Sequence, residues 1–333
     1  MKLQLKRLRD QVMVITGASS GIGLTTARAA ATAGARLVLV ARSRHALRQL
    51  VDEIRQRGGE AVDVEADVGV ESDVERVAER AMRLFGGFDT WVNNAGASVY
   101  GRCLEVSIDD MRRVIETNFW GVVYGSRVAC QHLTRRGGAL INVGSEVSDR
   151  AVPLQGIYSA SKHAVKGWTE ALRTELEYER APVSVTLIKP GPIDTPYAEH
   201  AKNYLPDAPQ HVAPVYSPDS VAASILYAAT TPVRDLFVGG AAKMVSTMNQ
   251  LSPRLTDKLV ANTIIPGTHS GRPRYERQDA LHQAGEDLRE RGDYPGMVRD
   301  STYTYATTHP IVTGAAMVTL GVGLSLLVAR RYR

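Results

Sequence analysis

The feature that most constrains this chain is a repeated alternation of short β-branched runs and longer amphipathic stretches through its first 240 residues. Runs of this length and composition are typical of buried strands, and the amphipathic stretches have the apolar spacing of helices. The alternation favours a doubly wound α/β fold, with a parallel sheet of about seven strands and helices on both faces. We predict strands over residues 12–16, 37–40, 61–64, 90–92, 139–143, 183–188 and 236–238, and helices over 21–33, 44–57, 73–85, 111–134 and 157–179.

A glycine-rich turn, TGASSGIG, follows the first predicted strand and opens the first predicted helix. Glycines in such a turn permit close backbone approach, and the helix N-terminus offers free N–H groups to a pyrophosphate. The spacing is G-x-x-x-G-x-G rather than the commoner G-x-G-x-x-G. Glycines often mark no more than a bend, but the strand before them and the helix after them indicate dinucleotide binding. We expect the cofactor to contact Gly17, Ser19, Ser20, Gly21, Ile22 and Gly23.

The end of the second predicted strand indicates which dinucleotide binds. A cofactor without a 2′-phosphate usually meets an Asp or Glu about 20 residues after the glycines. This chain has the sequence ARSR there, residues 41–44, with no carboxylate. The planar guanidinium of Arg42 suits a phosphate group, although a solvated arginine at a strand end is the alternative interpretation. The residues therefore favour NADP(H) over NAD(H).

Two further motifs carry polar side chains. The fourth predicted strand ends in NNAG, residues 93–96, where amides lie at the carboxyl edge of the sheet, although Asn and Gly also dominate ordinary turns. The sequence YSASK places Tyr158 and Lys162 four residues apart, on one face of a predicted helix. A cation there can hold a phenol nearer to ionisation, which would allow the tyrosine to exchange protons at neutral pH.

The motifs TGASSGIG, NNAG, ETNFWG, VGS, YSASK and KPG occur in this order, each in a fitting strand and helix context. Together they resemble the short-chain dehydrogenase/reductase family over roughly residues 8–240, with Ser145 standing 13 residues before Tyr158 as in that family. The resemblance implies a Rossmann-type fold with Tyr158 as general acid/base. It implies that Lys162 lowers the tyrosine pKa and bonds the nicotinamide ribose. It also implies that Ser145 orients the substrate oxygen and that Asn118 holds a water in a proton relay.

The same resemblance implies an oxidoreductase that exchanges hydride between NADP(H) and a small-molecule carbonyl or alcohol, and it implies a homo-oligomer. A catalytically silent scaffold or sensor that binds NADP(H) is the alternative function. Among the implied cofactor contacts, Asp67 could instead be a loop carboxylate and Thr195 a turn cap. The implied contacts are Asp67 and Val68 at the adenine, Asn94, Ala95 and Gly96 in the cleft, and Pro190, Gly191 and Thr195 at the nicotinamide carboxamide.

Charge and cysteine usage argue against several other classes of protein. The net charge of +5 comes from 40 basic and 35 acidic residues that are interspersed, without a basic run that would follow a nucleic acid backbone. The two cysteines, Cys103 and Cys130, have no C-x-x-C spacing, and the eight histidines have no ligand spacing. We therefore expect neither a nucleic acid partner nor a metal site, and a reducing cytoplasmic location.

The chain beyond residue 240 departs from the common family pattern. Residues 241–265 predict a helical extension interrupted at Pro253, and residues 266–310 are polar enough to predict a tether. Residues 311–329 then form an uncharged 19-residue run, followed by RRYR. A helix of that length spans about 28 Å, close to the ~30 Å of a bilayer core.

We expect residues 311–329 to be a single transmembrane helix that holds residues 1–240, the catalytic domain, at the cytoplasmic face of a membrane. A helix lying along the membrane interface, with Arg330, Arg331 and Arg333 at the headgroups, is equally compatible with the residues. A soluble oligomer whose tail packs against a partner subunit is a further alternative. A membrane location would favour a lipophilic substrate.

Overall fold

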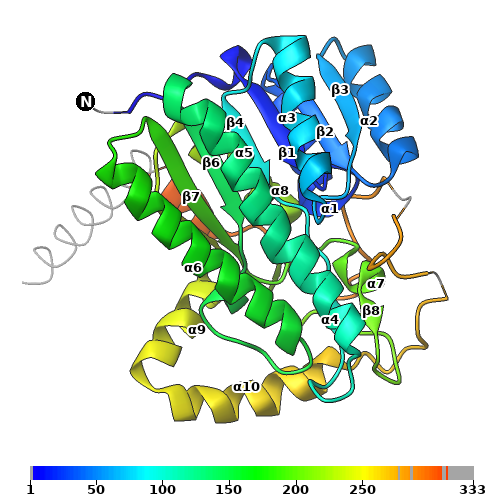
Figure 1. Cartoon of the computed structure of the whole chain (residues 1–333). Helices are drawn as coiled ribbons and strands as arrows, with labels where there is room; N and C mark the ends of the chain where they lie inside the picture. Colours follow the sequence, from blue (N-terminus) through cyan, green and yellow to red (C-terminus); the bar gives the residue numbers. More distant parts are fainter. Residues whose placement is uncertain (1–2, 277, 286–287, 310–312, 314–333) are drawn as a thin grey trace, which may run out of the picture.

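A computed structural model describes residues 3–276, 278–285, 288–309 and 313 of the chain. Seven parallel strands form one sheet in the order β10-β7-β6-β4-β1-β2-β3 (Figure 1). The strand order reverses between β1 and β4, which confirms the predicted doubly wound fold. The strands are β1 (Val12–Thr16), β2 (Arg36–Ala41), β3 (Ala61–Glu65), β4 (Thr90–Asn93), β6 (Gly138–Val143), β7 (Val183–Pro190) and β10 (Asp235–Val238).

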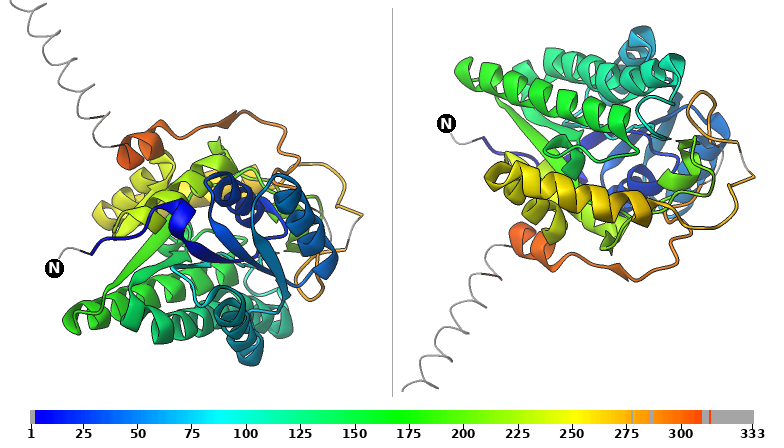
Figure 2. Two further views of the ribbon diagram at one scale, coloured as in Figure 1. Left: turned by 90° about the horizontal axis from the view of Figure 1, so that it is seen from above. Right: turned by 90° about the horizontal axis from the view of Figure 1, so that it is seen from below.

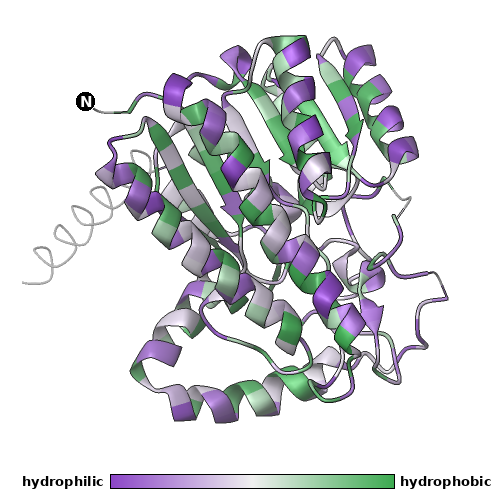
Figure 3. Cartoon of the chain, viewed as in Figure 1, coloured by the Kyte–Doolittle hydropathy of each residue, from purple (hydrophilic) through white to green (hydrophobic). Residues whose placement is uncertain are grey.

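Helices cover both faces of the sheet, as Figure 2 shows from above and below. Side chains alternate along β1, so that Met13 and Ile15 join the core on one face while Val12 and Val14 join the core on the other. Figure 3 shows the hydrophobic residues concentrated along these strands. Burial on two sides explains why the strands are continuous β-branched runs. The first face carries α1 (Gly21–Thr32), α2 (Arg44–Gln56) and α8 (Pro218–Thr230), and the second carries α3 (Glu71–Phe85), α5 (Gly121–Arg136) and α6 (Gly156–Tyr178).

The single helix predicted over residues 111–134 is divided in the structure. A shorter helix, α4 (Ile108–Ile115), leads into a π-helical turn, Glu116–Trp120, which then continues as α5. The turn contains Asn118, whose side chain is completely buried. A π turn accommodates one extra residue, and helical periodicity in a sequence does not reveal so small an insertion.

Two helices follow the last strand and pack near the carboxyl ends of the strands (Figure 1). They are α9 (Gly240–Leu251) and α10 (Pro253–Thr268), with Pro253 at the first position of α10, where its missing N–H is not needed. Short elements complete the fold: 3-10 helices Leu8–Asp10 and Glu146–Ser148, helix α7 (Tyr197–His200), and the strand pair β5 (Val99–Tyr100) and β8 (Lys202–Asn203).

The described residues of the expected tether, 266–310, differ from that prediction because they pack against the catalytic domain. Strand β11 (Val298–Arg299) pairs with β9 (Val215–Tyr216), and α11 (Thr302–Thr308) packs against α8 and β10. Ion pairs hold the part before β11, including Arg28–Glu290 at 2.8 Å and Arg289–Glu199 at 2.5 Å. Polar contacts, together with a few apolar ones such as that of the buried Leu281, attach this stretch, which explains why its composition predicts a tether.

The predicted membrane helix, residues 311–329, lies outside the described residues except for Thr313. Within the part of the chain that the structure describes, no helix has both the length and the apolar character needed to cross a bilayer.

Candidate active site

A cavity of about 390 Å³ lies at the carboxyl ends of the strands, where the strand order reverses. Ligands bind at this position in doubly wound folds, and the volume is in the range of ligand pockets. Of the predicted site residues, Gly23 and Asn118 lie outside its lining. The lining includes Gly17, Ser19, Ser20, Gly21, Ile22, Arg42, Asp67, Val68, Asn94, Ala95, Gly96, Ser145, Tyr158, Lys162, Pro190, Gly191 and Thr195.

The glycine turn leaves bare backbone at the cavity wall. Gly17 has φ +68°, and a Cβ atom there would stand 2.8 Å from Cα of Ala95. A Cβ on Gly23 would stand 2.0 Å from the carbonyl oxygen of Gly17, so this glycine permits the close packing of α1 against the turn. Only glycine fits at these positions. The chain thus has the close-approach backbone and helix N-terminus that a dinucleotide requires.

The glycine turn is covered by residues near position 289, a stretch that the sequence analysis did not connect with this site. The N–H of Gly21 donates a hydrogen bond to the carbonyl of Arg289 at 2.9 Å. Ala280, Ala284 and Gly285 line the cavity from the same stretch. We refer to the described residues of 279–292 as the cover segment. It contacts the glycine turn and forms part of the cavity wall.

The adenine end of the predicted cofactor site contains two arginines. Arg42 donates from Nη1 to the carbonyl of Leu281 at 3.1 Å and from Nη2 to the carbonyl of Ala280. Burial lowers the pKa of Arg42, and the nearby charge of Arg113 lowers it further. Arg113 pairs with Asp67 at 2.5 Å and donates to Leu281 at 3.2 Å. Arg42 is therefore held inward and is not a solvated arginine. No motif in the sequence indicated Arg113, which reaches Asp67 from α4.

Tyr158 and Lys162 extend from the same face of α6 into the cavity, as the four-residue spacing predicts. The Lys162 ammonium donates to the carbonyl of Val143 at 2.9 Å and lies 5.7 Å from the centroid of the Tyr158 ring. Burial lowers the pKa of Lys162 to about 8. The ammonium therefore uses one of its protons on the Val143 carbonyl and lies near the Tyr158 ring.

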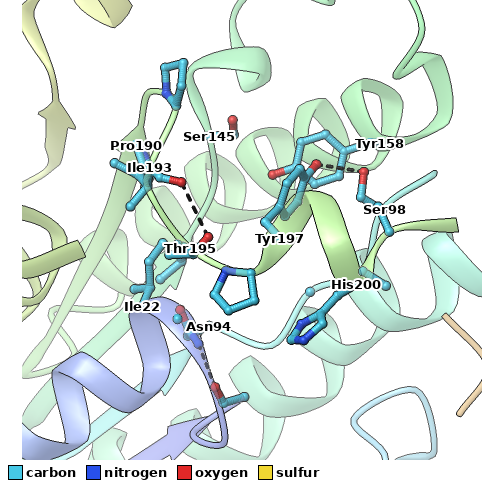
Figure 4. A pocket seen from close by; sticks show the side chains of 18 of the residues that line it. Ile22, Asn94, Ser98, Ser145, Tyr158, Pro190, Ile193, Thr195, Tyr197 and His200 are labelled. Atoms are coloured by element: carbon cyan, nitrogen blue, oxygen red, sulfur yellow. Dashed lines mark hydrogen bonds between the residues drawn. The ribbon is translucent and has the colours of Figure 1, made fainter. Parts of the chain in front are cut away.

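The hydroxyls of Ser145 and Tyr197 lie beside that of Tyr158 (Figure 4). Burial raises the pKa of Tyr158, and these two neighbouring hydroxyls lower it in part. Ser145 follows β6 and caps the 3-10 helix by accepting from the N–H of Val147 at 3.3 Å. This cap fixes the serine beside the tyrosine.

Asn118 positions the walls of the site from behind the cavity. Its side-chain oxygen accepts from the N–H of Ala97 at 2.7 Å, and its nitrogen donates to the carbonyl of Ala97 and to Ser161, both at 2.9 Å. The side chain thus ties the loop after β4 to α6. Asn94 is used similarly, since its amide donates to the carbonyl of Thr16 at 2.9 Å and stabilises the glycine turn.

Tyr197 is a site residue that the sequence analysis did not single out. Its hydroxyl donates to Ser98 at 2.7 Å and accepts from the amide of Gln155 at 2.7 Å. The ring centroid lies 5.5 Å from that of Tyr158, and Figure 4 shows the two rings side by side. Three separate parts of the chain supply this polar cluster, namely the loop after β4, the start of α6 and helix α7, so no local pattern in the sequence could have indicated it.

The segment predicted to hold the nicotinamide carboxamide follows β7 directly. Pro190 ends that strand, and Gly191 and Thr195 follow it along the cavity wall. The Thr195 hydroxyl makes a long contact of 3.5 Å with the carbonyl of Ile193, so its hydrogen-bonding capacity is largely unused by the local turn. Its side chain packs over Gly21, where a Cβ would stand 3.1 Å from that of Thr195.

Comparisons with known proteins agree with this arrangement. The short chain dehydrogenase family model matches residues 11–204. The uncharacterized oxidoreductase YxnA of Bacillus subtilis (strain 168) is 51% identical over 324 residues, which cover 96% of this chain and 91% of that protein.

Two solved structures are similar to the chain. An alcohol dehydrogenase from the archaeon Thermococcus sibiricus, complexed with 5-hydroxy-NADP, has a TM-score of 0.61 and 29% identity, covering 68% of this chain and 95% of that one. A short chain dehydrogenase/reductase from Burkholderia phymatum, in complex with NAD, has a TM-score of 0.67 and 25% identity, covering 84% of this chain and 99% of that one. The family match spans more than half of the sequence, and the match to YxnA spans nearly all of it. The chain therefore belongs to the short-chain dehydrogenase family, and it is an oxidoreductase that uses a nicotinamide cofactor.

Proposed function

We propose that the protein interconverts a carbonyl and an alcohol with NADP(H), and that Tyr158 is the general acid/base. The observation that carries this proposal is the grouping of the Ser145 and Tyr158 hydroxyls with the Lys162 ammonium in one buried cavity. A general acid must be within hydrogen-bond reach of the oxygen that it protonates, and the Ser145 hydroxyl marks a second donor for that oxygen.

When bound, the nicotinamide supplies or accepts the hydride. In the reductive direction the hydroxyls of Ser145 and Tyr158 donate to the carbonyl oxygen, and Tyr158 transfers its proton as the alkoxide develops. The pKa of Tyr158, raised by burial, keeps the phenol protonated and ready to donate. Lys162 contributes positive charge near the tyrosine that forms a phenolate, which stabilises the state after proton transfer.

The preference for NADP(H) rests on Arg42 and Arg113. Both guanidiniums converge at the predicted adenine end, where Arg113 pairs with Asp67 at 2.5 Å and with Glu116 at 3.9 Å. Arg42 donates to backbone carbonyls and has no carboxylate partner among the described residues, so its charge is available to a 2′-phosphate. Arg42 already donates to carbonyls of the cover segment, so a cofactor phosphate would have to share its guanidinium with them. We infer that the segment and the cofactor adjust their positions when the cofactor binds.

The substrate chamber supports a lipophilic substrate. Its walls near Ser145 include Val147 and Val152, and the helices after the last strand add Ala241, Val245 and Ile264. These apolar side chains would bind an apolar alcohol or ketone by excluding water. The 19-residue uncharged run at the C-terminus, if it anchors the protein to a membrane as we propose, would place this chamber beside a source of such compounds.

The test incubates the full chain with NADPH and a panel of small, steroid-like and lipid-like carbonyls while the absorbance of NADPH is followed. Consumption that depends on the carbonyl, with formation of the matching alcohol, is the expected result. Tight NADPH binding without turnover of any carbonyl, or of any alcohol with NADP⁺, would instead favour the silent scaffold or sensor.

A further inference from the structure

The proposed mechanism assigns no role to the carboxyl group of Glu146, which also belongs to the site. Glu146 directly follows Ser145 and begins the 3-10 helix Glu146–Ser148. It lines the same cavity as Tyr158. Within the described part of the chain its side chain makes no hydrogen bond and no ion pair. The Glu146 side chain is half-buried, and a carboxyl group that faces a ligand cavity without a protein partner is available to the ligand.

The surroundings of Glu146 do not compensate for its burial. Burial raises the pKa of this carboxyl to about 7, and no neighbouring cation opposes that effect. The two nearest buried lysines are already engaged, since Lys162 donates to the carbonyl of Val143 and Lys189 pairs with Asp149 at 3.1 Å. An unpartnered carboxyl group in this position costs free energy of folding. Leucine or alanine at this position would avoid that cost, so the carboxyl group needs a functional reason.

Glu146 lies close to the predicted reaction centre. Its Oε2 atom is 3.5 Å from where a Cβ of Gly191 would stand, so it faces the segment that follows β7. Its charge is near enough to Tyr158 to raise the pKa of that phenol. On the other side, Val147, Ala241 and Val245 provide apolar walls. Because Glu146 adjoins Ser145 in the chain and lines the same cavity, we expect the carbon atoms next to a carbonyl held by Ser145 and Tyr158 to lie on the Glu146 side.

We propose that Glu146 is a specificity-determining residue whose carboxyl group binds a hydroxyl group on the carbon next to the substrate's reacting carbonyl. This inference rests on the proposed carbonyl reduction. A carboxyl group can accept from a hydroxyl and, when protonated, can also donate to it. A hydroxyl fits better than an ammonium group, because moving an ammonium ion into an apolar chamber has a large desolvation cost. The substrate class is therefore a lipophilic α-hydroxy ketone, or the corresponding vicinal diol.

The test compares 1-hydroxy-2-heptanone with 2-heptanone, which differ only by the hydroxyl group. For the wild type we expect kcat/KM to be at least about tenfold higher for the hydroxy ketone, as is typical of a site built to hydrogen-bond a substrate group. In Glu146→Leu the ratio should fall to within about threefold of unity, and Glu146→Gln should retain an intermediate ratio. Glu175→Leu, the same change at an exposed position of α6, should keep the wild-type ratio.

Circular dichroism and NADPH binding check that each variant is folded, and Glu146→Ala replaces Glu146→Leu if the latter does not fold. A wild-type ratio near unity, or a ratio unchanged in both the leucine and alanine variants, would overturn the role of Glu146. Neither result affects the proposed function, because turnover of 2-heptanone would still show carbonyl reduction. Absence of turnover with both ketones and with the wider carbonyl panel would instead contradict the proposed function itself.

Discussion

The guanidinium of Arg42 donates a hydrogen bond to the carbonyl of Leu281 at 3.1 Å, across 239 positions of the chain. The same leucine is 1% exposed and packs in a cluster with Val99, Val106 and Val114. Leu281 thus anchors the cover segment at the wall of the cofactor cavity. We therefore expect the cover segment to slow the release of a cofactor bound against it.

Weakening that anchor should speed cofactor release. Leu281→Ala removes a buried side chain, a change that typically costs about 2–5 kcal/mol, and the loss falls on the attachment of the cover segment. We expect NADPH to dissociate at least about tenfold faster in stopped-flow fluorescence. Leu104→Ala, at a fully exposed leucine, is the matched control. An unchanged release rate would show that the segment does not limit cofactor exchange.

Cofactor choice should depend on Arg42. Arg42→Asp removes a candidate phosphate partner and adds repulsion, so NADPH affinity should fall at least about tenfold more than NADH affinity. Fluorescence titration with both cofactors measures this difference. Arg44→Asp makes the same change two positions later on a side chain that is 60% exposed, and it should leave the ratio nearly unaltered. Equal losses for NADPH and NADH in Arg42→Asp would contradict the assignment.

Removal of the Tyr158 hydroxyl should abolish proton transfer while preserving the fold. Tyr158→Phe is expected to lower kcat by at least the ~10²-fold typical of losing a general acid/base, with NADPH affinity nearly unchanged. Steady-state kinetics and cofactor titration separate the two effects. Tyr178→Phe, on the same helix but 90% exposed, serves as the control. Activity close to that of the wild type in Tyr158→Phe would eliminate the proposed mechanism.

Lys162 should reduce the stability of the cofactor-free protein. Its pKa of about 8 lies below the usual 10.5, so the folded state binds fewer protons than the unfolded state between these values, and stability rises with pH there. Lys162→Met should raise the free energy of unfolding by about 1–2 kcal/mol at pH 7, after allowing for the carbonyl of Val143 left unpaired.

This gain should shrink as the pH rises from 8 toward 10.5, and urea unfolding at pH 7 and 9.5 measures it. The control is Lys166→Met, four residues later, which removes an ion pair with Asp149 at 2.6 Å and should lower stability. A loss of stability in Lys162→Met at pH 7 would show that the ammonium stabilises the fold.

Truncation after His309 should separate a membrane anchor from the enzyme. The structure fixes this position, because α11 packs against α8 and its Thr304 is 3% exposed, so a cut within α11 would damage the fold. The truncated protein should be soluble without detergent and should keep the activity of the full chain on a water-soluble carbonyl. Carbonate extraction of membranes should retain only the full chain. Full-length protein in the soluble fraction would argue against the anchor.

The sequence alone determined the sheet, its helices and the position of the cavity. Strands such as β1 are buried on both faces, so they require continuous β-branched runs, and these are visible locally. The glycine turn and the pair Tyr158 and Lys162 are also local, since each depends on a few neighbouring positions with one required backbone geometry.

Only the tertiary structure decided what surrounds those motifs. Arg113 reaches Asp67 from α4, Tyr197 reaches Tyr158 from α7, and the cover segment returns to Arg42 from near the C-terminus. These contacts join residues far apart in the chain through single polar groups, which have no periodicity and can also be solvated. Their burial, and therefore their role in the site, exists only once the sheet and its loops have brought them together.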